Sequence, residues 1–310
     1  MPGTDAKMVP ATRGGPGGSM SETVGMLCAL GSAMSWSVTS LMVSALTPGI
    51  GSFTINAART TLTAAIVIGW MLLAGGLDTV LTLSMGSLAL LAVSIVLAIP
   101  IGDTIFFESA QRLGLGRAMT ISMSYPVLAA SLAALLLGER LSGPIVVGGL
   151  LTLAGLGLIV MARVEPPGEP RPWRGVVEAL LAALAWGVSV VALRVPLDEI
   201  DPVSAQAIRL PVGAVMLWVT PWALRGVPAL LRGGWPLFVR LLALAALTAV
   251  SSVMYGASVK YAGVAVASVL SSTAPLFAVP LGIVFLNERL PALALLGAVV
   301  TVAGIVVLRL

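Results

Sequence analysis

Long apolar stretches, separated by short polar segments, run along almost the whole chain. Ten of them are near the roughly 20 residues that a helix needs to cross about 30 Å of hydrocarbon. They cover approximately residues 23–46, 52–75, 87–109, 116–137, 143–162, 175–195, 202–224, 236–258, 263–286 and 291–308. The segments between them are rich in glycine and proline, as in TPGIG at 47–51. The pattern predicts an all-α integral membrane protein with ten transmembrane helices.

Composition supports lipid as the natural solvent of this chain. Of the 310 residues, 58% are hydrophobic and 10% are charged, whereas a soluble domain carries about 25% charged residues. The formal net charge of +4 is small, and no basic tract accompanies it, so we expect no nucleic-acid partner. The expected partners are the lipid bilayer and a small-molecule substrate, and the chain is expected to be a monomer or a homodimer.

The rarest residue types exclude several kinds of chemistry. The chain has no histidine and one cysteine, Cys28, which rules out a cysteine–histidine zinc site and a Ser–His triad. No P-loop sequence is present, so this chain alone is not expected to pump with ATP. We therefore expect no cofactor and no metal site, and we expect that the protein is not an enzyme.

Two breaker-rich segments divide the chain. Residues 1–22, which include GGPGGS at 14–19, are expected to form a disordered tail. The proline-rich segment 163–174 is expected to be a stiff linker. It separates a first unit, 23–162, from a second unit, 175–310.

The two units carry matching residues in the same order. An offset of 150 pairs Trp36 with Trp186 and Arg59 with Arg209. After the loss of one residue, an offset of 149 pairs Pro126 with Pro275, Gly138-Glu139-Arg140-Leu141 with Asn287-Glu288-Arg289-Leu290, and Gly148 and Gly155 with Gly297 and Gly304. Apolar composition alone would not align tryptophans, arginines and charged phrases. The chain is therefore predicted to be an internal duplication of five helices.

An odd number of helices in each copy has a geometric consequence. The copies must enter the membrane from opposite sides, so they form two inverted five-helix repeats related by a pseudo-two-fold axis in the membrane plane. Transporters use this arrangement around a central cavity. The charged phrase after the fourth helix of each repeat is expected to anchor that helix end at the membrane interface, with substrate contact as the alternative.

Each repeat has tryptophan in its first helix, arginine in its second and a GER-L or NER-L phrase after its fourth. In this the chain resembles the EamA family of the drug/metabolite transporter superfamily. The resemblance implies ten helices, a central cavity, cytoplasmic termini and transport of small metabolites, often export of amino acids. It points to the cell membrane, as a multi-pass protein of a bacterial inner membrane. The distribution of lysine and arginine favours the reverse orientation, because more of them fall on the non-cytoplasmic side.

Two arginines stand within the predicted spans, where charge is costly. Arg59 and Arg209 are candidates to hold a carboxylate or phosphate of the substrate from two sides. Their presence in both copies also fits a structural role, in which each reaches the interface or binds neighbouring carbonyl groups.

Acidic residues in the third span break the repeat symmetry. Asp103 and Glu108 correspond to Ser252 and Ala257 at the offset of 149. Glu108 is close to the end of the span, whereas Asp103 is deeper and follows Pro100, which can open the local backbone. Asp103 is therefore the candidate for proton coupling or for attracting a cationic group. The alternatives are a hydrogen bond to a neighbouring helix or a structural pairing with Arg59.

Aromatic and hydroxyl side chains supply the other candidates for substrate binding. Trp36, Trp186, Tyr125 and Tyr255 are predicted to face the cavity, although packing between helices is the common alternative. Ser122 and Ser271 are expected near its floor, with bonds back to their own helices as the alternative. Pro126 and Pro275 are expected to bend the fourth and ninth spans.

Together, these patterns and the resemblance predict a membrane transporter for a small polar or amphipathic metabolite, such as an amino acid or related compound. It is expected to work by alternating access in the direction of export. Facilitated exchange and proton coupling are both compatible with the sequence. The alternative is a lipid flippase or scramblase that uses a groove between the repeats.

Overall fold

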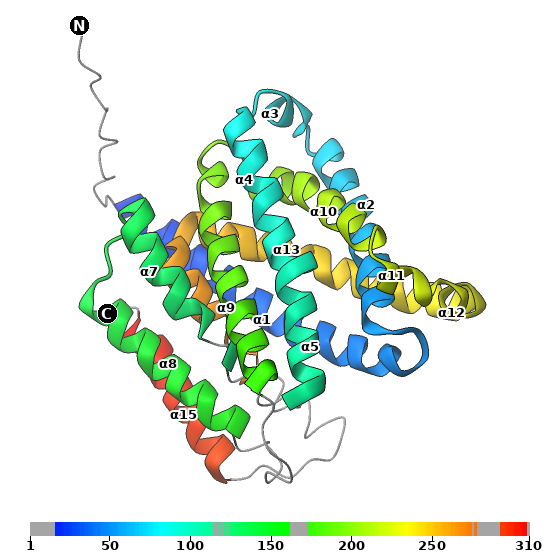
Figure 1. Ribbon diagram of the computed structural model, residues 1–310. Helices are drawn as coiled ribbons and strands as arrows, with labels where there is room; N and C mark the ends of the chain where they lie inside the picture. Colours follow the sequence, from blue (N-terminus) through cyan, green and yellow to red (C-terminus); the bar gives the residue numbers. More distant parts are fainter. Residues whose placement is uncertain are drawn as a thin grey trace, which may run out of the picture.

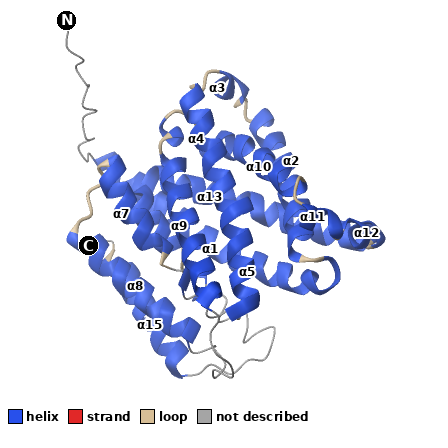
Figure 2. Cartoon of the chain, viewed as in Figure 1, coloured by secondary structure: helices blue, strands red, loops and turns tan. Residues whose placement is uncertain are grey.

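The structure, a computed structural model, describes residues 16–113, 118, 121–122, 124–161, 173–274, 276–277 and 292–308. Within these ranges the regular elements are all helical, as the sequence predicts (Figures 1 and 2). The first repeat contains α1 (Pro16–Ile50), α2 (Ser52–Leu73), α3 (Leu77–Leu81), α4 (Met85–Val96), the π-helical η1 (Leu97–Asp103), α5 (Thr104–Leu113), α7 (Tyr125–Leu137) and α8 (Gly143–Met161). The second contains α9 (Trp173–Arg194), the short 3-10 helix η2 (Pro196–Asp198), α10 (Pro202–Trp218), α11 (Pro221–Arg225), α12 (Val227–Arg232), α13 (Gly234–Ser271) and α15 (Ala292–Val307).

Several of these helices have the length and composition of membrane spans. Among the described residues, four helices are long and apolar enough to cross a bilayer, or up to five if the bent pair at 202–232 is one span. In that pair, α10 ends at Trp218 and the chain turns by 71° into α11 and α12, so the predicted span 202–224 is too long at its end. Pro221 explains the stop, since it cannot continue a helix that needs its backbone N–H group.

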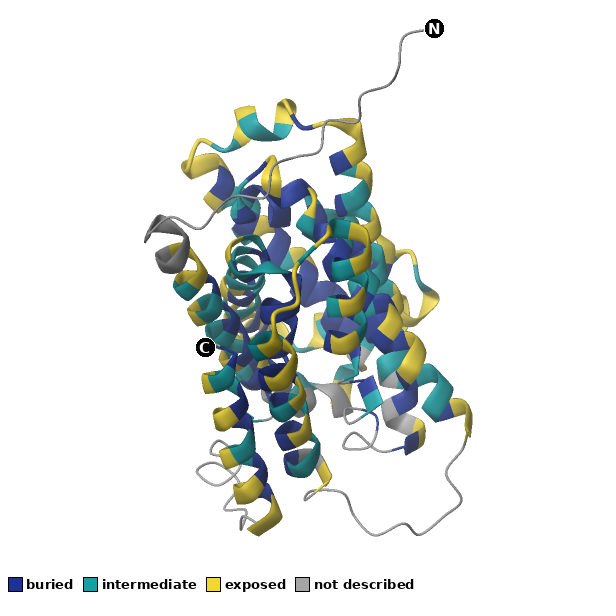
Figure 3. Cartoon of the chain, turned by 90° about the vertical axis from the view of Figure 1, so that its left-hand side faces the viewer, coloured by how far each residue is buried: buried dark blue, intermediate teal, exposed yellow. Residues whose placement is uncertain are grey.

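The outer surface of the bundle is apolar, as a lipid-facing surface must be. Leu135 is 80% exposed, and Leu73 and Trp235 are similarly open. Buried residues follow the inner faces of the helices and exposed residues follow their outer faces (Figure 3). The hydrophobic positions of the sequence therefore cover the outside of this molecule as well as its core.

The beginning of the chain differs from the prediction. Residues 16–22 were expected in a disordered tail, but α1 begins at Pro16 and includes them. Proline is tolerated in the first turn of a helix because the N–H group there has no intrahelical acceptor. Residues 1–15 lie outside the described residues, and so does 162–172, which contains most of the predicted linker. Its last two residues, 173–174, begin α9.

A break at Gly263 separates the predicted eighth and ninth spans. The backbone of Gly263 has φ +81°, which interrupts the long α13, and glycine adopts this left-handed region without steric cost. The Glu139 carboxylate, from the first charged phrase, accepts hydrogen bonds from Val264 N at 2.9 Å and Ala265 N at 3.4 Å. The acid of the phrase thus caps a helix of the other repeat. The second phrase, 287–290, lies outside the described residues, as do Pro275 and Pro280.

Contacts between the repeats are reciprocal. Helix α1 packs on α13, and its counterpart α9 packs on α4, η1 and α5, which correspond to parts of α13. Helix α2 packs on α13, and its counterpart α10 packs on α4. Helix α2 also packs on its own counterpart α10, and helix α8 packs on its own counterpart α15. Such exchange of partners is what a two-fold relation between two copies produces.

Helices α8 and α15 form a separate layer beside the other helices (Figure 1). Glycines spaced seven residues apart, close to two helical turns, face each other in this pair: a Cβ atom built on Gly155 would lie 2.6 Å from Gly297 O, and one on Gly148 would lie 2.7 Å from Gly304 O. These small faces bring the two backbones close together.

Candidate functional site

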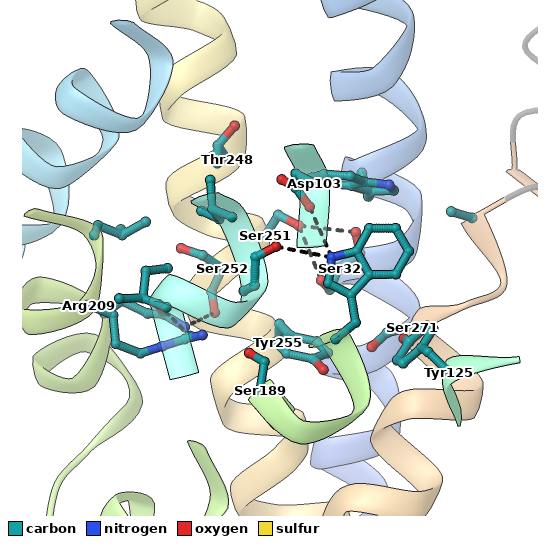
Figure 4. Close-up of a pocket in the computed structure, with 18 of the residues that line it drawn as sticks. Ser32, Asp103, Tyr125, Ser189, Arg209, Thr248, Ser251, Ser252, Tyr255 and Ser271 are labelled. Carbon is teal, nitrogen blue, oxygen red and sulfur yellow. Dashed lines mark hydrogen bonds between the residues drawn. The ribbon is translucent and has the colours of Figure 1, made fainter. Parts of the chain in front are cut away.

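A cavity of about 240 Å³ is lined by both repeats. The first repeat contributes residues of α1, α2, α4, η1 and α7, and the second contributes residues of α9, α10 and α13. In the view of Figure 4, Arg209 lies on one side of the cavity and Tyr125 and Ser271 lie on the other, with Tyr255 between them. The walls combine aromatic rings and hydroxyl groups with a few charges, as small-molecule sites commonly do.

The structure brings together every predicted site residue except Ser122. The lining includes Trp36, Arg59, Asp103, Tyr125, Trp186, Arg209, Tyr255 and Ser271. Ser122 is fully buried, and its Oγ donates a hydrogen bond to Ala179 O at 3.3 Å. The expectation that Ser122 lies at the floor of the cavity is therefore wrong, because its hydroxyl is used to hold α9.

Asp103 is placed by an irregular backbone segment. It ends the π-helical η1, which contains Pro100, and it is buried. The indole Nε1 of Trp186 donates to Asp103 Oδ1 at 3.1 Å and to Ala98 O at 3.1 Å. Pro100 has no N–H group for the helical ladder, and the widened helix leaves a carbonyl oxygen in reach of a side chain from the other repeat. The expected opening of the backbone at Pro100 is observed.

The π-helix accounts for the single residue by which the repeats differ in length. Before it, Leu91, Ser94 and Ile95 are buried like Leu241, Leu244 and Ala245, at an offset of 150. After it, Gly102 and Ser109 are buried like Ser251 and Ser258, at an offset of 149. The change of offset therefore falls between residues 95 and 102, where η1 holds its extra residue. An insertion of one residue is the common origin of a π segment, and such segments are frequent at functional sites.

Trp186 is the centre of an aromatic cluster in this wall. Its ring lies 5.3 Å from Phe106 and 6.0 Å from Tyr125, the latter in an edge-to-face arrangement. Tyr125 donates its hydroxyl proton to Ser268 O at 3.0 Å, which ties α7 to α13. These rings are held in place by neighbours in both repeats, so they form a rigid wall.

The two arginines are both 4% exposed and both line the cavity. Arg209 donates from Nε to Ser94 Oγ at 2.8 Å and from a terminal nitrogen to Gln206 Oε1 at 3.1 Å. Arg59 donates from a terminal nitrogen to Asn56 Oδ1 at 2.5 Å, and its guanidinium carbon lies 5.7 Å from the ring centre of Trp36. The ion pairs among the described residues do not include Arg59 with Asp103.

The hydroxyl residues at the end of α13 divide between the two expected roles, cavity lining and bonding to their own helix. Ser272 and Thr273 donate back to Val269 O and Leu270 O, each at 2.7 Å. Ser271 lines the cavity, and within the described chain its buried Oγ has no hydrogen-bond partner. Pro126 lies in the first turn of α7, so the predicted bend within a continuous helix is instead a break, since proline fits best where a helix begins.

Several polar lining residues were missed by the sequence reasoning. Gln206 supports Arg209 just as Asn56 supports Arg59, and each amide stands three residues before its arginine. The signal was present, because NAAR at 56–59 and QAIR at 206–209 align in the repeat. Ser32 and Ser251, whose hydroxyl groups are 3.2 Å apart, could not have been found, because neither stands out among the serines of apolar spans.

Comparisons with known proteins agree with this architecture. An "Uncharacterized transporter" of Archaeoglobus fulgidus is 28% identical over 71% of this chain and 75% of its own length. A "Probable terminal-alkyne amino-acid exporter" of Streptantibioticus cattleyicolor is 30% identical over 63% of this chain and 64% of its own length. A solved crystal structure superposes with a TM-score of 0.72 at 20% identity, covering 92% of this chain and 97% of that one, which shows the fold.

The family comparison matches the chain twice, once in each predicted repeat. The EamA-like transporter family matches residues 23–161 and 173–310. The two matches begin and end close to the predicted units, and together they cover most of the chain. The chain is a membrane protein that belongs to the EamA-like transporter family.

Proposed function

We propose that this protein exports an amino acid or a closely related small metabolite across the cell membrane by alternating access. The observation that carries the proposal is the cavity lined by both repeats, with two arginines, one acid and an aromatic wall. A zwitterionic substrate with an apolar side chain needs both charge signs and rings to pack against. The printed name of the relative in Streptantibioticus cattleyicolor, an exporter of an amino acid, supports the same class.

The proposed architecture has ten membrane crossings, in two inverted repeats with both termini in the cytoplasm. The reciprocal packing of α1 and α9 on the opposite repeat supports this arrangement. When two such repeats exchange conformations, a central site opens first to one side and then to the other. Trp36, Trp186, Tyr125, Tyr255 and Ser271 are the proposed substrate-binding residues, together with at least one of the two arginines.

The test is efflux from liposomes that contain the purified protein. A panel of L-amino acids is loaded inside, and release is measured with and without an imposed pH gradient. Faster release of one or more amino acids than from protein-free liposomes is expected. Release at the protein-free rate for the whole panel would reject the proposed substrate class.

Asp103 is the proposed site of proton coupling, since a carboxyl group within the membrane can carry a proton through the transport cycle. Asp103→Asn keeps a group that can accept the hydrogen bond from Trp186. In this variant, exchange of substrate across the membrane is expected to continue while the response to a pH gradient disappears. Wild-type transport that ignores the pH gradient would show facilitated exchange instead.

A further inference from the structure

The two arginines occupy equivalent positions in the repeats, but their surroundings have diverged. Arg209 is held from three helices. Its Nε donates to Ser94 of α4, and the amide of Gln206 is itself fixed by a bond from its nitrogen to Ser252 O of α13 at 2.9 Å. Ser94 Oγ also donates to Leu91 O at 2.7 Å, so this acceptor has a fixed orientation. The guanidinium of Arg209 therefore joins α4, α10 and α13.

Arg59 lacks the corresponding partner. At the offset of 150 that applies before the π-helix, the position of Ser94 is taken by Leu244, which is fully buried and has no hydroxyl group. As a result, Nε of Arg59 is buried without a hydrogen-bond partner among the described residues. A buried unpaired donor of a charged group is costly, and a functional role is one of the few reasons for which a native structure retains one.

The two equivalent tryptophans also differ in their contacts. Trp36 lies against the guanidinium of Arg59, whereas its counterpart Trp186 donates to Asp103 and Ala98 in the other repeat. A guanidinium stacked on a ring keeps its N–H groups directed outward in its own plane. A carboxylate binds such an edge with two parallel hydrogen bonds.

We propose that Arg59 binds the carboxylate of the substrate, with Trp36 covering one face of the guanidinium, and that Arg209 is a positioning residue that joins α4, α10 and α13. This assignment rests on the proposed function, because it names the residue that recognises the acid group of an amino acid. It differs from a symmetric clamp, in which both arginines would hold the same anion.

The experiment measures binding to the purified full-length protein in detergent by ligand-induced shifts of the melting temperature. The probes are L-amino acids, each paired with its α-amide, together with inorganic phosphate. In the wild type, each acid that binds is expected to bind at least about tenfold more tightly than its amide. Arg59→Lys keeps the charge but loses the planar fork, so the acid-to-amide ratio should fall toward one with little change in the melting temperature of the free protein.

Arg209→Lys is expected to have the opposite pattern, with a lower melting temperature of the free protein and an acid-to-amide ratio like the wild type. Arg232→Lys, at an exposed position in α12, is the matched control and should change neither quantity. Because a purely structural arginine alters melting but not the ratio, the ratio separates the two roles.

The outcomes that overturn the proposal are distinct from failure of the proposed function. A ratio that survives Arg59→Lys, or that collapses in Arg209→Lys, rejects the assignment of Arg59 even if amino acids are exported. Stabilisation by phosphate but by no amino acid, lost in Arg59→Lys, supports Arg59 as the anion-binding residue and rejects the proposed substrate class. A wild-type protein that none of the probes stabilises rejects both.

Discussion

At the scale of single residues, Glu139 connects the two halves of the molecule. Its carboxylate, which follows the fourth predicted span, binds the backbone N–H groups that begin the second part of α13 after Gly263. A carboxylate at a helix start accepts otherwise unpaired N–H groups and interacts favourably with the helix dipole. The charged phrase noticed in the sequence is thus a cap between repeats, in keeping with a structural role.

Replacing Glu139 with Gln should destabilise the protein by about 1–3 kcal/mol, because the bonds to a charged acceptor are replaced by weaker ones. The expected result is a lower melting temperature of the purified protein in detergent. Glu22→Gln, at an exposed position in α1, is the control and should melt like the wild type. Equal melting temperatures for the two variants would contradict the capping role.

Glu199 forms a second carboxylate contact, at the end of η2 and outside the spans. Its Oε1 accepts from Ser87 Oγ and its Oε2 accepts from Ser84 N at 3.3 Å, at the beginning of α4. The hydrogen bond from Ser87, followed by that from the Ser84 backbone, lowers the pKa of the Glu199 carboxyl. The folded protein therefore stabilises the charged form of the Glu199 carboxyl more than the unfolded chain does.

A lowered pKa gives a defined pH dependence. The contribution of Glu199 to stability is fully present above its unfolded pKa of about 4.3, and it is lost as the pH falls through the lower folded value. As the pH falls below about 4.3, the wild type should therefore lose more stability than the Glu199→Gln variant does. Melting curves between neutral and acidic pH, with Asp78→Asn as an exposed control, measure the difference. Parallel curves for Glu199→Gln and the wild type would refute this contribution.

At the scale of elements, α8 and α15 pack backbone against backbone. The backbones approach at Gly155 and Gly297, where a built Cβ atom on either residue lies 2.6 Å from the facing carbonyl oxygen. In lipid, such an approach supplies dispersion contacts that a hydrophobic effect between helices cannot. Because these helices contact the rest of the bundle less than each other (Figure 1), their mutual fit determines their position.

Gly155→Leu should separate α8 from α15 and cost about 1–3 kcal/mol or more, since backbone atoms cannot move aside as a side chain does. The measurement is the melting temperature in detergent. Gly157→Leu provides a matched control on the same helix, because nothing lies within 4 Å of its built Cβ atom. A similar loss in both variants would show that helix propensity, rather than the close approach, is responsible.

The sequence predicted most of the helices, but it predicted fewer of the contacts between them. Hydrophobic periodicity and the repeat located most of the described helices, and the family resemblance implied the central cavity that both tryptophans, both arginines and Asp103 line. The sequence could not distinguish Arg59 from Arg209, because their different partners come from distant helices. Ser122 was misplaced for a similar reason, since the direction of a hydroxyl group depends on which helix packs beside it. The π-helix was visible only as a change of offset, because a single inserted residue leaves hydropathy unchanged.

At the scale of the whole molecule, duplication explains how so few charged residues build a shared cavity. Each repeat supplies one tryptophan and one arginine, and reciprocal packing brings these four residues to one cavity. An amide three residues before each arginine supports it. The proposed inversion also places equivalent loops on opposite sides of the membrane. The loop before α4 and the loop after α10 are such a pair.

Single cysteines can test the inversion, after Cys28, the only native cysteine, is replaced by serine. In cells, a membrane-impermeant maleimide should label Leu231→Cys in α12 directly but label Thr82→Cys, beside α3, only after permeabilisation. Both positions are exposed in the structure. Labelling from the same side would reject the inverted arrangement. The exact reverse pattern would preserve the inversion and place the termini outside.

The extra residue in η1 has a consequence for the energetics of transport. Two identical inverted repeats would give degenerate inward-open and outward-open states, because exchanging the shapes of the copies converts one state into the other. The first repeat contains a π-helical turn that the equivalent part of α13 lacks, so this exchange is no longer between equals. Under the proposed alternating access, the empty protein is expected to favour one side over the other even without a gradient. For the proposed exporter, that built-in imbalance determines on which side the free cavity waits for its next substrate.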